Sequence, residues 1–280
     1  PDAADHYRGH HQRWPDLVLS DRGVIMATAV MRAMLVALAG LGAASASAAA
    51  PKVCPHQGVW LQVLGSGGPE VQDRRASSSY LLWRDGKARV LVDAGGGSAL
   101  RFGESGARVE DLRLVLFSHF HVDHSVDFPA LIKSSYFGNR HRPLPVFGPA
   151  AGGDFPGTGQ FIDGLFAPGT GVYRYLSGLV DDDQGGYALQ AHEVAWPADN
   201  HKADNQKRES DESPVRQVFA DEGITATATP VVHGPVPALA WRVAVAGVSV
   251  VFSGDTNGNS GHLQTLARHA DVLVAHNAIA

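Results

Sequence analysis

The sequence contains a single cysteine, Cys54, among its 280 residues. A disulfide within the chain and a zinc site built from cysteines are therefore both excluded. Positive charge is also scarce, since 23 lysines and arginines face 28 aspartates and glutamates, which gives a formal net charge of −5. This balance offers no electrostatic case for binding DNA or RNA, so no nucleic-acid partner is favoured.

Long hydrophobic runs are missing as well. The apolar segment 33–41 is too short to span a membrane comfortably, so we expect no stable membrane anchor. It follows Arg32 and precedes the small-residue run 43–50, which contains Ala-Ser-Ala at 46–48. A positive charge, a short apolar core and an Ala-x-Ala site are typical of a secretory signal peptide, although a buried helix would produce a similar run. We therefore predict a signal peptide at 26–50 and a periplasmic or secreted protein.

The rest of the chain is predicted to form one domain. Residues 1–25 have no periodic pattern, and we interpret them as a non-native upstream segment. Residues 51–280 are long enough for a single α/β domain, and a hydrophobic content of 44% is sufficient for its core. The polar stretch 181–214 is expected to be a surface loop between strands.

The segment 118–124 is the most informative part of the chain, because it contains three histidines and one aspartate in the pattern H-x-H-x-D-H. Imidazole nitrogens and carboxylate oxygens are ligands that zinc and similar divalent metals prefer. His119 and His121 can point to one side of an extended segment, while Asp123 and His124 turn toward a second point nearby. One loop could then serve two metal ions about 3.5–4 Å apart. A polar loop with chance histidines is the alternative.

The surroundings of this segment favour the metal site. The apolar run 112–117 immediately before it indicates a buried strand, whose rigid end can fix metal ligands. Residues 128–133 indicate the start of a helix, with Pro129 in its first turn. Three more β-prone runs are each followed by an aspartate or a histidine with glycine nearby. They are 89–92 before Asp93, 224–232 before His233, and 248–252 before Asp255. Taken singly, these residues could cap a turn, lie on the surface or begin a loop.

Together these motifs resemble the metallo-β-lactamase-fold hydrolases over about residues 59–280. The resemblance implies an α/β fold in four layers, αββα, with two sheets between helices and metals at one edge. The segments 63–69 and 77–82, together with Gly148-Pro149, are similar to the ribonuclease Z-like and arylsulfatase-like members. Ordinary turns are the alternative explanation for these segments.

The resemblance also implies roles for individual residues. His119, His121 and His233 correspond to ligands of a first metal ion, and Asp123 and His124 to ligands of a second. Asp255 corresponds to the carboxylate that bridges both ions, and Asp93 to a residue that supports the histidine loop without binding metal. We expect two divalent ions, zinc in the first place, with manganese or iron as alternatives.

His276 is the remaining candidate. It resembles the histidine of a His-Glu-Ala segment that assists proton transfer in the ribonuclease Z branch, although Asn277 stands where that branch has glutamate. A polar residue closing a strand is the alternative. The family also has a last histidine ligand, which we expect beyond Ala280 in a C-terminally truncated chain. The predicted catalytic residues are Asp123, Asp255 and His276.

These expectations predict a secreted zinc-dependent hydrolase with a dinuclear centre that uses a metal-bound hydroxide. The expected substrates are small-molecule phosphodiesters or sulfate esters. The signal peptide, the acidic balance and the lack of a basic arm argue against tRNA processing. A carbonyl substrate, such as a β-lactam, lactone or thioester, is one alternative, and an inactive truncated product with an incomplete metal site is another. The oligomeric state is not predicted.

Overall fold

The computed structural model describes residues 57–181, 183, 185–196, 215–259 and 261–276, all within one compact unit that spans Cys54–Ala280. The predicted upstream segment, the predicted signal peptide and Cys54 lie outside the described residues, so these assignments stay predictions. Among the described residues, no helix is long and apolar enough to cross a membrane.

The first sheet has six strands in chain order, from β1 to β6. β1, β2 and β3 are antiparallel, and β3 to β6 run parallel. Parallel neighbours need crossover connections. The connections from β3 to β4, from β4 to β5 and from β5 to β6 all contain helices or helical turns. The strands are β1 Val59–Gly65, β2 Ser79–Arg84, β3 Lys87–Val92, β4 Leu114–Leu116, β5 Leu144–Pro149 and β6 Leu189–Val194. The α-helices between them are α2 Ser98–Glu104, α3 Val122–Ser125, α4 Phe128–Ser134 and α5 Thr158–Phe166. The short 3-10 helices are η2 Val71–Asp73, η3 Val109–Asp111, η4 Ser135–Phe137 and η5 Arg174–Leu176.

The second sheet has five strands in the order β11-β10-β9-β8-β7. β7 to β10 form an antiparallel meander, and β11 returns parallel to β10 after helix α6. The elements are β7 Arg216–Asp221, β8 Ile224–His233, β9 Val236–Val245, β10 Val248–Phe252, α6 His262–Ala267 and β11 Val272–Val274.

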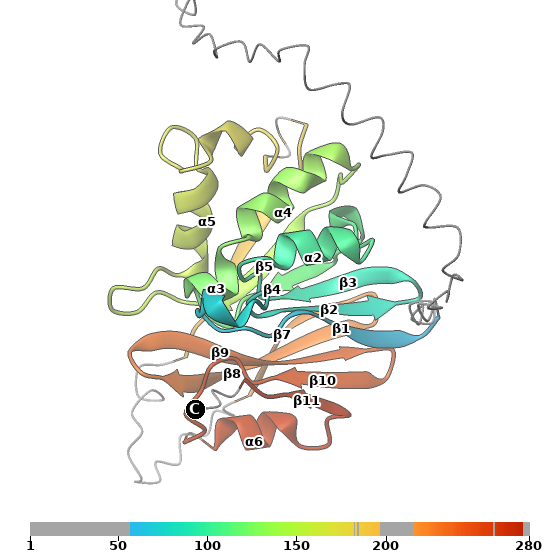
Figure 1. Cartoon of the computed structure of the whole chain (residues 1–280), viewed down its shortest axis with the longest axis vertical. Coiled ribbons are helices and arrows are strands. Elements are labelled where there is room, and N and C mark those ends of the chain that lie inside the picture. Colours follow the sequence, from blue (N-terminus) through green and yellow to red (C-terminus); the bar gives the residue numbers. More distant parts are fainter. Residues whose placement is uncertain (1–56, 182, 184, 197–214, 260, 277–280) are drawn as a thin grey trace, which may run out of the picture. The chain divides into compact units, whose positions relative to one another are not determined.

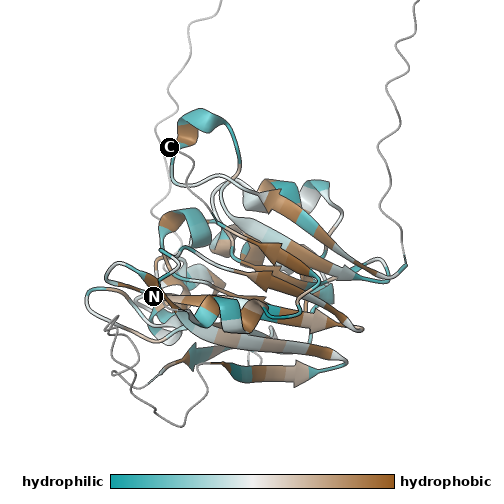
Figure 2. Ribbon diagram, turned by 90° about the horizontal axis from the view of Figure 1, so that it is seen from below, coloured by the Kyte–Doolittle hydropathy of each residue, from teal (hydrophilic) through white to brown (hydrophobic). Residues whose placement is uncertain are grey.

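Alternating side chains on the strands build three apolar layers. Leu82 and Val90 of the first sheet share one buried cluster with Trp241 and Val243 of the second, so the sheets pack face to face. The opposite face of the first sheet, including Leu81, packs against α2, α4 and α5, and α6 covers the outer face of the second sheet. Figure 1 shows this order of helices, sheet, sheet and helix, and Figure 2 shows the hydrophobic colour concentrated along the strands. The predicted four-layer α/β fold is confirmed.

The predicted strands before Asp93, His119, His233 and Asp255 are all present as β3, β4, β8 and β10. The expectation of a loop throughout 181–214 is wrong, because β6 lies within it and pairs with β5 along its whole length. Most side chains of β6 are exposed, so this edge strand has no apolar alternation to reveal it. Residues 197–214 lie outside the described part of the chain.

Backbone hydrogen bonds bring several strand ends to one edge of the sandwich. Asp93 N donates to Leu116 O at 2.8 Å, which joins the ends of β3 and β4. Leu239 N of β9 donates to Ser118 O at 2.9 Å, which joins the two sheets directly before His119. Residues that are far apart in the sequence therefore meet at this edge.

Candidate metal centre

Asp93 anchors the histidine loop to the first sheet. It is fully buried and has a φ of 56°, a left-handed conformation that aspartate tolerates better than most residues. Its carboxylate accepts hydrogen bonds from Ser118 N at 2.7 Å and from Ser118 Oγ at 2.8 Å. The end of β4 is therefore held in place immediately before the first histidine.

Two glycines allow the strand ends to approach this loop closely. A Cβ atom on Gly95 would lie 2.0 Å from the carbonyl oxygen of Asp123. Gly254 has a φ of 56°, and a Cβ there would lie 2.9 Å from Ser118 Cβ. Close backbone packing thus explains Gly95 and Gly254, whereas Gly234 has open space around it and a φ of 58° that favours glycine.

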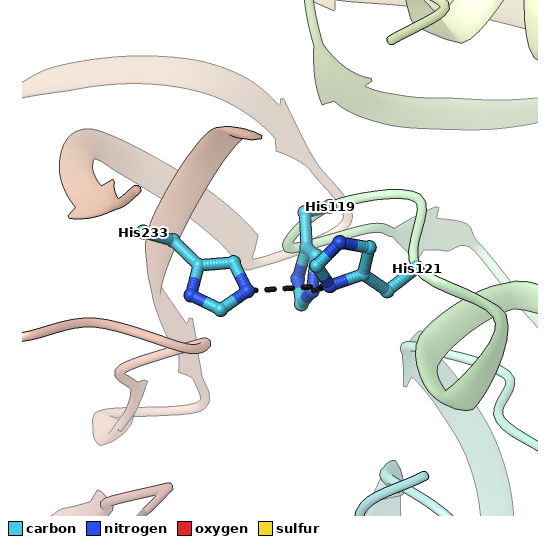
Figure 3. Close-up of side chains that lie close together, drawn as sticks. All are labelled: His119, His121 and His233. Carbon is cyan, nitrogen blue, oxygen red and sulfur yellow. Dashed lines mark hydrogen bonds between the residues drawn. The ribbon is translucent and has the colours of Figure 1, made fainter. Parts of the chain in front are cut away.

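Three imidazoles converge on one side of the centre. His119 and His121 come from the loop after β4, and His233 comes from the end of β8 (Figure 3). His119 Nε2 lies 3.0 Å from His121 Nδ1, and His233 Nε2 lies 3.2 Å from the same nitrogen. One nitrogen of each ring lies within 4.8 Å of the others. We call these residues the imidazole set.

A second group surrounds His124, whose side chain is 1% exposed. Its Nδ1 donates to Asp93 Oδ2 at 2.8 Å. Its Nε2 faces two more carboxylates, Asp255 Oδ1 at 3.4 Å and Asp123 Oδ2 at 3.7 Å. We call Asp93, Asp123, His124 and Asp255 the acidic set. His119 also lies within 4.8 Å of His124 and Asp255, so it adjoins both sets.

Asp255 turns one carboxylate oxygen toward each set. Its Oδ1 lies 3.4 Å from His124 Nε2, and its Oδ2 lies 3.7 Å from His233 Nε2. A carboxylate in this position is suited to contact two cations at once.

The electrostatics of the two sets differ. Burial lowers the pKa of His119 to about 2 and also lowers the pKa of His233, so both imidazoles are neutral as metal ligands must be. Burial alone would lower the pKa of His124, but Asp93 and Asp255 outweigh it and raise this pKa to about 10. Burial opposes ionisation of Asp255, yet its interactions with His124 hold the pKa of this carboxyl well below the ordinary range. The carboxylates that keep His124 protonated would also favour a metal cation in its place.

His276 lies at the same edge, after β11. Its Nδ1 is 3.4 Å from Asp255 Oδ1 without forming a hydrogen bond, and its Nε2 is 2.9 Å from the hydroxyl of Tyr80. Its backbone N donates to Ser253 Oγ at 2.9 Å. Burial raises the pKa of Tyr80 to about 12, so the phenol is neutral. Sequence reasoning missed Tyr80, because no local pattern reveals a contact between residues 196 positions apart.

The donor set fits divalent metal ions. Every residue predicted as a ligand lies at this edge, and neutral imidazoles combined with carboxylates suit zinc, manganese and iron. These residues are His119, His121, Asp123, His124, His233 and Asp255. Ser118 was not assigned a role from the sequence, although its Oγ lies 3.1 Å from His119 Nδ1 and 3.2 Å from His124 Nδ1.

Comparison with known proteins identifies the family. Residues 73–278 match the model of the metallo-beta-lactamase superfamily, and the chain belongs to this superfamily of metal-dependent hydrolases. Ribonuclease Z of Mycobacterium bovis (strain BCG / Pasteur 1173P2) is 30% identical over 220 residues, which cover 76% of this chain and 68% of the relative. Ribonuclease Z of Mycolicibacterium gilvum (strain PYR-GCK) is 29% identical over 216 residues, covering 76% and 66%. The chain thus spans about two thirds of these relatives.

A solved structure shows the same fold. The short form of human tRNase Z superposes with a TM-score of 0.55 at 21% identity, covering 76% of each chain.

The expectation that no nucleic-acid partner is favoured is wrong, because the relatives at this level of identity are ribonucleases. The error came from the net charge, which sums over the whole chain. It does not describe the local field at a site where bound cations can meet a phosphate.

Proposed function

We propose that this protein is a metal-dependent phosphodiesterase that cleaves RNA at a centre of two divalent ions, zinc in the first place. The observation that carries the proposal is the position of Asp255, with one oxygen toward the imidazole set and the other toward the acidic set. A phosphodiester is favoured over a sulfate ester because the relatives are ribonucleases.

The ligands divide between the two ions. His119, His121 and His233 would hold the first ion, Asp123 and His124 the second, and Asp255 both. When bound, such ions supply Lewis acidity, activate water for attack and neutralise charge on the phosphate.

The remaining residues position these ligands and move a proton. Asp93 accepts the Nδ1 hydrogen of His124, so Nε2 would be the nitrogen that binds metal once its own proton is displaced. His276 would protonate the leaving oxygen from Nδ1, which has no hydrogen-bond partner among the described residues, because Tyr80 occupies Nε2.

Export is a separate proposal. If residues 26–50 are a signal peptide, the enzyme acts on RNA in the periplasm or outside the cell. N-terminal sequencing of the protein from periplasmic and cytosolic fractions tests this. A cytosolic protein that retains residues 26–50 would contradict it.

The function is tested with a substrate panel on purified protein: an RNA oligonucleotide, bis(p-nitrophenyl) phosphate, an aryl sulfate and a β-lactam. We expect metal-dependent cleavage of the first two, which chelation abolishes and added zinc restores. Asp255→Asn should lower the rate by about a thousandfold, since it affects both ions. Asp163→Asn, an exposed carboxylate on α5, is the matched control and should leave the rate unchanged. Hydrolysis of the sulfate or β-lactam alone, or full activity of folded Asp255→Asn, would contradict the proposal.

A further inference from the structure

A cavity of about 480 Å³ lies where the two sheets separate. The end of β5 and the loop after it form one wall, the end of β6 forms a second, and the hairpin between β8 and β9 forms a third. These walls comprise the segments 149–153, 194–196, 231–232 and 234–239.

This cavity adjoins the metal centre. Gly234 in its wall directly follows His233 in the chain. Leu239, also in the wall, donates its backbone N–H to Ser118 O at 2.9 Å, next to His119. The loop that forms the first wall continues to Phe155, whose ring centre is 5.8 Å from that of His121. The cavity therefore flanks the imidazole set.

The chemistry of the cavity differs from that of the metal centre. Among the described residues that line it, none has a charged side chain, and proline, glycine, alanine, valine, leucine and one tryptophan form its walls. Trp196 is 7% exposed, and the guanidinium of Arg216 lies 5.1 Å from its ring centre. Such walls suit a neutral, flat, largely apolar group, and the volume lies within the range of small-molecule sites, roughly 300–1,000 Å³.

We propose that this cavity binds a nucleobase of the nucleotide whose phosphate lies at the metal centre, a proposal that rests on the proposed function. An RNA substrate carries an anionic phosphodiester and a neutral aromatic base a few bonds apart. The cation site and the adjoining apolar cavity match this pair of groups. Apolar walls contact the faces of a base without a specific set of hydrogen bonds, so several bases fit.

The proposal is tested by the binding of two ligands that carry the same phosphate on the same sugar. Adenosine 5′-monophosphate has a base and ribose 5-phosphate has none. Isothermal titration calorimetry on the zinc-loaded protein measures both dissociation constants. Burial of the base should make adenosine 5′-monophosphate bind at least about tenfold more tightly.

A variant that fills the cavity locates the effect. Ala151 lines the cavity and its side chain is exposed on a loop, so Ala151→Trp occupies the space without disturbing the core. It should weaken adenosine 5′-monophosphate binding to the level of ribose 5-phosphate and leave ribose 5-phosphate binding unchanged. Ala220→Trp is the matched control, because Ala220 is exposed on β7 outside the cavity.

The outcomes separate the two proposals. Equal binding of both ligands to the unaltered protein overturns the base pocket and leaves the phosphate site standing. A preference for the base that survives in folded Ala151→Trp also overturns the pocket. If neither ligand binds the zinc-loaded protein, the proposed function and the pocket fail together. The comparison on the unaltered protein holds even where the variant does not fold.

Discussion

The imidazole set and the acidic set lie side by side but are built in opposite ways. The imidazole set has three histidines, of which His119 is buried and neutral, while His121 and His233 are partly exposed. The acidic set surrounds one buried histidine with three carboxylates. The first set offers nitrogen donors to a metal ion, whereas negative charge dominates in the second. The two sets should therefore differ in how strongly metal loss and protonation affect folding.

The coupling to the fold differs as well. His124 and Asp93 are 1% and 0% exposed and are hydrogen-bonded to each other. His121 lies near the surface, with its Nδ1 directed toward two other rings. His124 and Asp93 are thus part of the buried structure, while His121 and His233 lie nearer the surface.

The largest effect is expected at the residue that adjoins both sets. His119→Ala removes a donor within reach of His121, His233, His124 and Asp255. We expect RNA cleavage to fall by about a thousandfold and the zinc content to fall below about one ion per chain. Mass spectrometry of the metal content and single-turnover cleavage measure the two effects. His141→Ala, an exposed histidine before β5, is the control. A folded variant that keeps both ions would show that His119 is not a metal ligand.

A second comparison separates folding from metal binding. In metal-free protein, His124→Ala leaves the buried Asp93 carboxylate with Ser118 as its one remaining partner among the described residues, and should lower the free energy of unfolding by about 3–5 kcal/mol. His121→Ala breaks no contact with a buried charge and should cost about 1 kcal/mol or less. Urea denaturation after chelation measures both values. Equal losses would mean that the acidic set is not tied to the fold more firmly than the imidazole set.

The sequence predicts this edge well where ligands follow apolar runs. β4, β8 and β10 are buried strands, and their apolar runs predict that a ligand follows each of them. Close backbone packing at glycine follows β3 and β10, and these glycines mark Asp93 and Asp255 in the sequence. The H-x-H-x-D-H motif predicts the loop histidines because it directly follows the apolar run of β4. In each case the signal is local in the chain.

Features that depend on packing between distant segments were not predicted. The contact of Tyr80 with His276 joins β2 of the first sheet to the segment after β11 of the second, and the β6 edge strand is held by backbone pairing with β5. The apolar cavity forms only when the end of β6 meets the β8–β9 hairpin. The orientation of Asp255 between the two sets likewise depends on how the sheets pack.

His124 and His119 should also respond oppositely to pH in metal-free protein. The pKa of His124 is raised from 6.5 to about 10, so its contribution to stability is complete below pH 6.5 and is lost as the pH rises through 10. The pKa of His119 is lowered from 6.5 to about 2, so its contribution is present above pH 6.5 and is lost as the pH falls toward 2. One proton limits each slope to about 1.4 kcal/mol per pH unit. Urea denaturation across this range measures both slopes, and His124→Ala should lack the alkaline one. An alkaline slope that persists in His124→Ala would contradict the assignment.

The smallest effect is expected at Ser118, whose hydroxyl touches both sets. Ser118→Ala removes the hydrogen bond to Asp93 Oδ2 and the contacts with the Nδ1 atoms of His119 and His124, while the bond from Ser118 N to Asp93 remains. We expect a loss of about 1 kcal/mol in unfolding free energy and a decrease of about tenfold in zinc affinity. Ser134→Ala, whose hydroxyl bonds only to a carbonyl oxygen within α4, is the control. Competition with a zinc chelator measures the affinity of each ion in turn. If the Ser118 hydroxyl orients both His119 and His124, the zinc affinity of both ions should fall. A decrease in the affinity of one ion alone would show that the hydroxyl orients a single histidine.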